Sequence, residues 1–127
     1  MHHDSRHRPK NLKLASIRLP IPALVSILHR ATGALIFLLL PAFLWTFQRS
    51  LSSPEGYQEV MALAQHQLVK LALLGVLWAF LHHFLAGIRH LTLDMRIGLE
   101  IRQARRSSKL VLIGGLLLTL LIGACWW

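Results

Sequence analysis

Three long apolar runs constrain the fold of this chain more than any other feature. They extend roughly over Pro22 to Phe47, Leu68 to Ile88 and Leu110 to Trp127. A helix needs about 20 residues, each rising 1.5 Å, to cross the hydrocarbon core of a bilayer. All three runs reach that length, the third only marginally, and the remaining residues are too few for a soluble core. The sequence therefore predicts an all-α membrane protein with three transmembrane helices in a single domain, residues 1–127.

Prolines and turn residues place the expected boundaries. Proline is tolerated in the first turn of a helix, so Pro22 favours a helix start, whereas Pro41 inside the first run should kink it. The residues Ser52–Gly56 are typical of a turn, which we expect to lead into a short surface helix over Tyr57–Gln65. The expected elements are a segment over 1–21 and spanning helices over about 22–48, 67–90 and 108–127.

Basic residues indicate the orientation in the membrane. They precede the first run and separate the second from the third, at Arg6, Arg8, Lys10, Lys13, Arg18, Arg96, Arg102, Arg105, Arg106 and Lys109. By the positive-inside rule the N-terminus is expected to be cytoplasmic and the C-terminus periplasmic. We ascribe the net charge of +9 to this topology and to contact with membrane lipids, not to nucleic acid, because the cations flank apolar spans. The lone Cys125 excludes an intrachain disulfide.

Polar and ionisable residues inside the first two runs point to a functional site. Ser26, His29 and Arg30 lie in the first run, and His82, His83 and His90 in or beside the second. A charge at membrane depth costs about 2.5 to 3.5 kcal/mol on insertion scales, so such residues usually serve an ion, a proton or a cofactor. At 1.5 Å per residue, Arg30 lies roughly 12 Å and His83 roughly 10 Å from the cytoplasmic ends of their helices. The two clusters are therefore expected to share a level and to line one cavity open to the cytoplasm.

Helical spacing places these residues on defined faces. One side of the first helix carries Ala23, Ser26, Arg30, Gly33 and Phe37, and one side of the second carries Ala72, Gly75, Ala79, His83, Ala86, Gly87 and His90. His82 points about 100° away from His83. The small residues around His83 have two readings: close packing of helices, or room for a flat macrocycle whose iron His83 holds.

The chemistry of these groups admits several functions. A deep imidazole can relay protons, pack through a hydrogen bond or ligate haem iron, and a haem also needs cations for its propionates. Those cations are available at His29, Arg30, Arg89 and His90. No second histidine lies at matching depth, so a second axial ligand would come from another chain. Ser26 and Arg30, one turn apart, could donate to a quinone oxygen on which negative charge develops; alternatively, the Ser26 hydroxyl bonds back to its own helix.

Four segments, in chain order, resemble the cytochrome b556 membrane-anchor subunits of succinate dehydrogenase. They are Arg8–Leu12, SIRLPIPALVSILHRATG at Ser16–Gly33, SLSSPEG at Ser50–Gly56, and HHFLAGIRHLTLD at His82–Asp94. The resemblance covers nearly the whole chain, and the two longer segments are specific. It implies three helices packed with a second anchor subunit around haem b, beneath an iron–sulfur subunit and a flavoprotein subunit.

The resemblance also implies roles for particular residues. The family's H-x-x-x-G-I-R-H pattern puts the haem ligand at His83 and a residue near the propionates at His90. Its S-I-L-H-R pattern puts ubiquinone donors at Ser26 and Arg30, with Arg30 also near a propionate. The second haem ligand and a tyrosine donor would come from the other anchor, and a register error of one residue would move the ligand to His82.

The function that this resemblance implies is transfer of electrons from succinate to ubiquinone in the tricarboxylic acid cycle and respiratory chain. Succinate would be oxidised at FAD in one partner, and iron–sulfur clusters in another would carry the electrons. A bacterial inner membrane is expected, because the matching region begins within the first ten residues and leaves no room for a transit peptide. Two alternatives remain: a haem-free structural anchor, and a proton-conducting or transport subunit that uses Arg30 and His83 as a relay.

Overall fold

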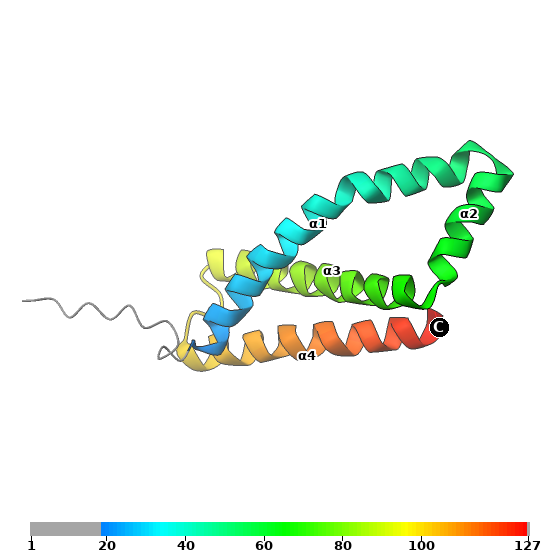
Figure 1. The fold of residues 1–127 in the computed structure, drawn as a ribbon. Coiled ribbons are helices and arrows are strands. Elements are labelled where there is room, and N and C mark those ends of the chain that lie inside the picture. The colour runs from blue at the N-terminus through cyan, green and yellow to red at the C-terminus, as the bar shows by residue number, and fades with distance from the viewer. Residues whose placement is uncertain (1–18, 127) are drawn as a thin grey trace, which may run out of the picture.

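Four helices make up the part of the chain that the structure, a computed structural model, describes, which is residues 19–126 (Figure 1). They are α1 (Ile21–Ser52), α2 (Pro54–Gln65), α3 (Gln67–Asp94) and α4 (Ile101–Trp126). No strand occurs within residues 19–126, and α1, α3 and α4 are each long and apolar enough to cross a membrane. The prediction of an all-α chain with three apolar spans is confirmed. The basic residues from Arg6 to Arg18 and the segment Arg8–Leu12 lie outside the described residues.

The observed helices are longer than the expected spans. α1 continues to Ser52, and α4 begins at Ile101 and not near residue 108. The residues added to α4 include arginine, glutamine and alanine, which are good helix formers, so the basic flank continues the helix instead of forming a loop. The connection before α4 contains Arg96 and Gly98, at φ 61° and 81°, a conformation that turns the chain back sharply.

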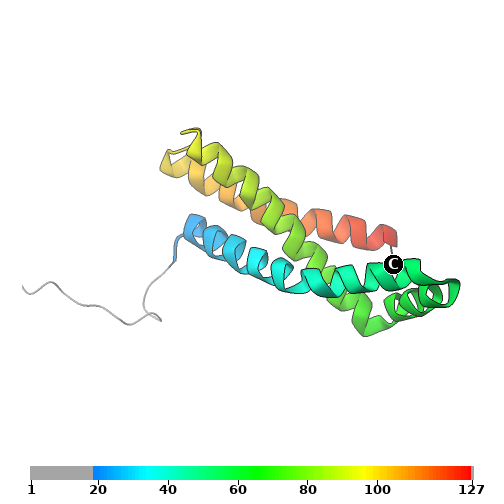
Figure 2. The same cartoon turned by 90° about the horizontal axis from the view of Figure 1, so that it is seen from above.

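The helices form an open frame (Figures 1 and 2). α3 and α4 run antiparallel, side by side, and α1 crosses α3 before moving away from it. α1 continues through Pro41 and bends along its length (Figure 1), in agreement with the expected kink. α2 then connects the end of α1 to the start of α3, and the three helices enclose an apolar groove of about 410 Å³.

The short helix α2 is fixed at its start by capping. The backbone amide of Gly56 donates to Ser53 Oγ at 3.0 Å, and Pro54 occupies the first turn, where no amide is needed. The pKa of Glu55 is lowered, chiefly by a hydrogen bond from the Glu55 backbone amide and to a smaller extent by one from the Ser53 side chain. A 2.7 Å ion pair between Arg49 and Glu59 joins α1 to α2. The short helix is thus confirmed, but the turn is narrower than expected: only Ser53 is non-helical, because Ser52 still belongs to α1 and Pro54–Gly56 already form the first turn of α2.

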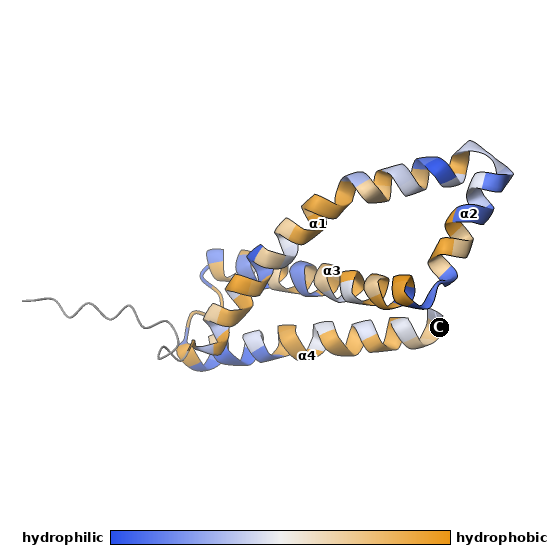
Figure 3. Cartoon of the chain, viewed as in Figure 1, coloured by the Kyte–Doolittle hydropathy of each residue, from blue (hydrophilic) through white to orange (hydrophobic). Residues whose placement is uncertain are grey.

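The core is confined to one half of the frame. Val25, Ala86 and Val111, from α1, α3 and α4, are buried together, and Leu85 and Leu112 pack against them. Most of the large apolar side chains in the described residues stay exposed, and the long helices are largely apolar along their length (Figure 3). Such surfaces are stable only against lipid or other membrane helices. The polar residues of α1 and α3 meet at this same core.

Candidate functional site

His83 is tied to α1 by a hydrogen bond that fixes its tautomer. Its Nδ1 lies 3.0 Å from the backbone carbonyl oxygen of His29. A carbonyl oxygen only accepts, so Nδ1 carries the hydrogen and Nε2 of a neutral ring keeps a free lone pair. Within residues 19–126, Nε2 of His83 has no hydrogen-bond partner. The orientation is that of a metal-binding histidine, whose second nitrogen usually donates to a carbonyl or carboxylate.

Three histidines gather at this point. The rings of His29 and His83 stack with centroids 4.2 Å apart and planes 4° apart, and His90 lies 4.9 Å from His29 at a tilt of 54°. Gly87, between His83 and His90 on α3, lies against the His29 ring: a Cβ built there would be 3.5 Å from Nε2 of His29, an ordinary contact. The expectation that the polar clusters of the two helices share a level is therefore confirmed for His29 and His83.

Gly33 is the residue that lets the His83 ring approach α1. A Cβ built on Gly33 would lie 2.7 Å from Cε1 of His83, closer than real contacts allow, whereas one on Gly75 would meet no atom within 4 Å. We expect Gly33→Ala to displace the ring and to destabilise the fold by about 1 to 3 kcal/mol, as overpacking does. Gly75→Ala, the matched change on α3, should cost nothing, because alanine is the better helix former. Thermal unfolding of the purified protein measures both; equal midpoints would mean that His83 does not rest on Gly33.

His82 points to the other side of α3, as its position one residue before His83 predicts. It is fully buried, its ring stacks on Trp78 at 5.4 Å, and its backbone approaches Gly115 of α4. Neither ring nitrogen makes a well-formed hydrogen bond among the described residues, although the ring lies near the backbone of Val25 on α1. His82 thus lies between α3 and α4 and also approaches the α1 backbone at Val25, while His83 packs on Gly33 and His29 of α1.

Arg89 shares the α4 side of α3 with His82. It is buried, its Nε donates to Ser107 Oγ at 3.0 Å, and a terminal nitrogen donates to the carbonyl of Ala104 at 3.3 Å. The structure therefore groups His29, His83 and His90 but places Arg89 in contact with the start of α4. In this chain the guanidinium connects two helices.

Ser26 and Arg30 lie beside the histidine cluster on an open face of α1. Arg30 is exposed, and its Nε donates to the backbone carbonyl of Ser26 at 3.4 Å. The Ser26 hydroxyl makes no hydrogen bond within residues 19–126, unlike those of Thr32, Thr46 and Thr119, which bond back to their helices. The back-bonded alternative for Ser26 is therefore not what the structure shows. A free hydroxyl and a guanidinium remain available to a ligand.

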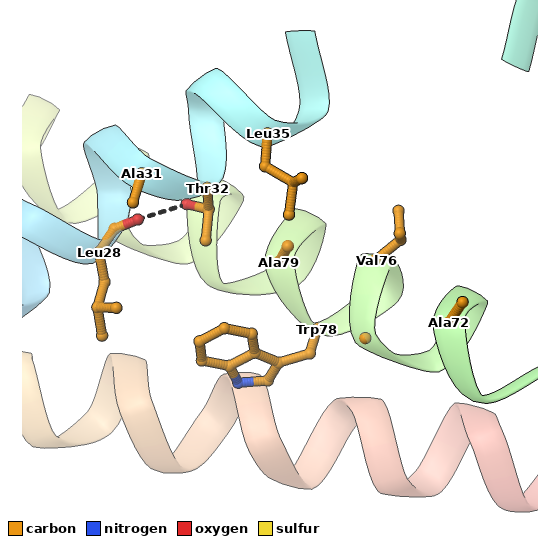
Figure 4. Close-up of a pocket in the computed structure, with 9 residues that line it drawn as sticks. Leu28, Ala31, Thr32, Leu35, Ala72, Val76, Trp78 and Ala79 are labelled. Carbon is orange, nitrogen blue, oxygen red and sulfur yellow. Dashed lines mark hydrogen bonds between the residues drawn. The ribbon is translucent and has the colours of Figure 1, made fainter. Parts of the chain in front are cut away.

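The small residues of α3 serve two purposes. Ala79 and Ala86 are buried, as close packing of helices through small residues would make them. Farther along, Ala72 and Gly75 line a shallow groove of about 450 Å³, together with Thr32 of α1 and Trp78 (Figure 4). The small residues nearest His83 are therefore buried between helices, whereas Ala72 and Gly75 are exposed to the groove.

Two features of the site could not be read from the sequence. One is the acceptor of the His83 hydrogen bond, a backbone carbonyl that leaves no signature in residue types. The other is the pairing of Arg89 with Ser107, which depends on α4 beginning at Ile101. The sequence does show Ser107 among basic residues just before an apolar run. Such a serine is common at helix starts, so it does not specifically predict a contact with Arg89.

The arrangement can hold one ligand of a metal but not a complete coordination shell. Within residues 19–126 no three histidine, cysteine or acidic side chains are placed to bind an ion. A metal at His83 would need ligands from a macrocycle, from another chain or from both.

Comparison with known proteins identifies the family. The pattern of succinate dehydrogenase/fumarate reductase transmembrane subunits matches residues 4–122. The succinate dehydrogenase cytochrome b556 subunit of Paracoccus denitrificans is 34% identical over 91% of this chain and 88% of its own. The same subunit of Coxiella burnetii is 33% identical over 94% of this chain and 97% of its own. The mitochondrial cytochrome b560 subunit of Dictyostelium discoideum is 29% identical over 84% of this chain and 56% of its own. The chain belongs to the family of succinate dehydrogenase/fumarate reductase transmembrane subunits.

Proposed function

We propose that this chain is the membrane anchor of a bacterial succinate:quinone oxidoreductase that binds haem b and ubiquinone. Succinate is oxidised at FAD in a flavoprotein partner, and an iron–sulfur partner delivers electrons to quinone beside this chain. A second anchor subunit completes the membrane part. The N-terminus lies in the cytoplasm and the C-terminus in the periplasm, as the basic flanks indicate. The observation that carries the proposal is the hydrogen bond from His83 to the His29 carbonyl.

The residues around His83 fit a haem. Nδ1 is committed to the carbonyl of His29, so Nε2 is the nitrogen that would hold the iron. The His29 ring lies 4.2 Å from the His83 ring and 4.9 Å from the His90 ring, between centroids. Together with Arg30, His29 and His90 supply positive charge for propionates. When bound, the haem supplies a centre that accepts and returns single electrons. A further ligand to the iron would come from the other anchor.

Ser26 and Arg30 are the groups that we assign to quinone. The free hydroxyl of Ser26 and the terminal guanidinium nitrogens of Arg30 can donate to the quinone oxygen on which charge develops during reduction. Ser26 lies about one turn before His29 and Arg30 directly follows it, so a quinone bound to them would lie beside a haem held by His83. Arg89, bonded to Ser107, holds α3 against α4 behind the site and adds positive charge there.

A reduced-minus-oxidised visible spectrum of the complex tests this proposal. The complex is purified from native membranes through a tag on this chain and reduced first with succinate and then with dithionite. We expect a b-type α band together with flavoprotein and iron–sulfur partners. Partners without the band would favour the haem-free anchor; neither band nor partners from an intact preparation would refute the assignment, and proton flux without quinone reduction would support the relay.

A further inference from the structure

The start of α4 carries a cationic face that the site does not use. Arg102, Arg105, Arg106 and Lys109 are exposed and follow the three-and-four spacing of one side of a helix. No acidic residue occurs in α4, and none of the four cations forms an ion pair within residues 19–126. Figure 3 shows this hydrophilic start giving way to an apolar helix. The charge on this face is therefore uncompensated by the described part of the chain.

The same side of α4 continues as an apolar stripe. Ile113 is 55% exposed, Leu117 is 60% and Leu120 is 54%, and their spacing extends the line from Arg102, Arg106 and Lys109. The buried residues of α4, at Ser108, Val111, Gly115 and Thr119, lie on the opposite side, against the neighbouring helices. The exposed side thus presents charge first and hydrocarbon next, within one uninterrupted helix.

We propose that this side of α4 is a binding site for an anionic phospholipid of the cytoplasmic leaflet. The phosphate contacts Arg102, Arg106 and Lys109, and the acyl chains lie along Ile113, Leu117 and Leu120. This order of charge and apolar surface is that of a lipid standing in a leaflet, and basic clusters at helix ends on this side of a membrane attract anionic headgroups. An acidic protein partner would explain the cations alone but not the apolar stripe in line with them. The site is independent of haem and quinone.

The experiment compares two single arginine variants of the purified complex. Arg106→Gln removes a cation from the cationic face of α4, whereas Arg96→Gln removes an exposed arginine from the loop between α3 and α4. Each leaves the other basic flanking residues in place and so preserves orientation. Native mass spectrometry of the detergent-purified complex, titrated with phosphatidylglycerol or phosphatidylcholine, gives the affinity for each lipid.

We expect phosphatidylglycerol to bind the native complex more tightly than phosphatidylcholine. Arg106→Gln should weaken the binding of phosphatidylglycerol about fivefold, which corresponds to the loss of one interfacial cation. The double variant Arg106→Gln with Lys109→Gln should weaken this binding more than tenfold. Arg96→Gln should change it less than twofold. Equal losses in both single variants would indicate diffuse surface charge and overturn the site. Loss of a protein subunit from the Arg106 variant, with phosphatidylglycerol binding unchanged, would assign this face to a protein partner.

Discussion

Replacing His83 with leucine is expected to abolish most of the b-type absorbance of the complex. Within residues 19–126, His83 is the one histidine on the α1 side of α3 whose ring is oriented by a hydrogen bond to a backbone carbonyl. Its Nε2 is therefore the candidate ligand, and leucine cannot bind iron. The fold should persist, because leucine matches the ring approximately in volume and replaces one half-buried polar group. Haem content per complex, measured as the pyridine haemochrome, gives the result.

His82→Leu is the matched control, one residue away on the same helix. Haem should be retained, because His82 faces Trp78 and α4. Stability should be about equal, since leucine keeps the buried packing and removes two nitrogens that make no well-formed hydrogen bond. If the His82 variant lost haem and the His83 variant kept it, the ligand assignment would shift by one residue. Loss in both would point to assembly of the helices.

Hydrophobic run length was sufficient to predict the three spans, because the bilayer fixes how much apolar helix is needed. The ends of the helices were predicted less accurately than their number. α4 begins at Ile101, since good helix formers continue the helix past the membrane boundary, where hydropathy no longer reports on structure. The crossing of α1 over α3 depends on Gly33 fitting the His83 ring, a contact between residues 50 apart that no local pattern encodes.

The site was predictable where helical spacing alone decides. His82 and His83 do face different neighbours, and His29 does meet His83. Spacing could not decide what each side chain contacts. Arg89 reaches Ser107 because α4 passes beside it, and Ser26 keeps a free hydroxyl although other hydroxyls of the long helices bond backwards. Both outcomes follow from tertiary packing. The cationic side of α4 was visible in the sequence as a charge run, but its alignment with an exposed apolar stripe required the longer helix.

Ser26→Ala and Arg30→Gln are each expected to slow quinone reduction by about 100- to 1,000-fold, the effect of removing one donor to a developing negative charge. Oxidation of succinate with an artificial acceptor that takes electrons from the partners should be unchanged. Arg30→Lys, which keeps the charge but not the planar fork, should recover part of the rate. The rate of succinate:ubiquinone reductase activity, divided by the rate with the artificial acceptor, measures the effect independently of enzyme yield.

Ser50→Ala controls for loss of a hydroxyl elsewhere on α1. Its Oγ donates to the Phe47 carbonyl at 2.7 Å, near the opposite end of the helix from Ser26. It should leave the ratio unchanged, because a hydroxyl satisfied within its own helix offers nothing to a ligand. A fall in both activities of the Ser26 variant would indicate a defect in assembly, and an unchanged ratio in the Ser26 and Arg30 variants would place the quinone elsewhere. A selective fall at Ser26 alone would make its free hydroxyl the donor, and would leave Arg30 to the propionates.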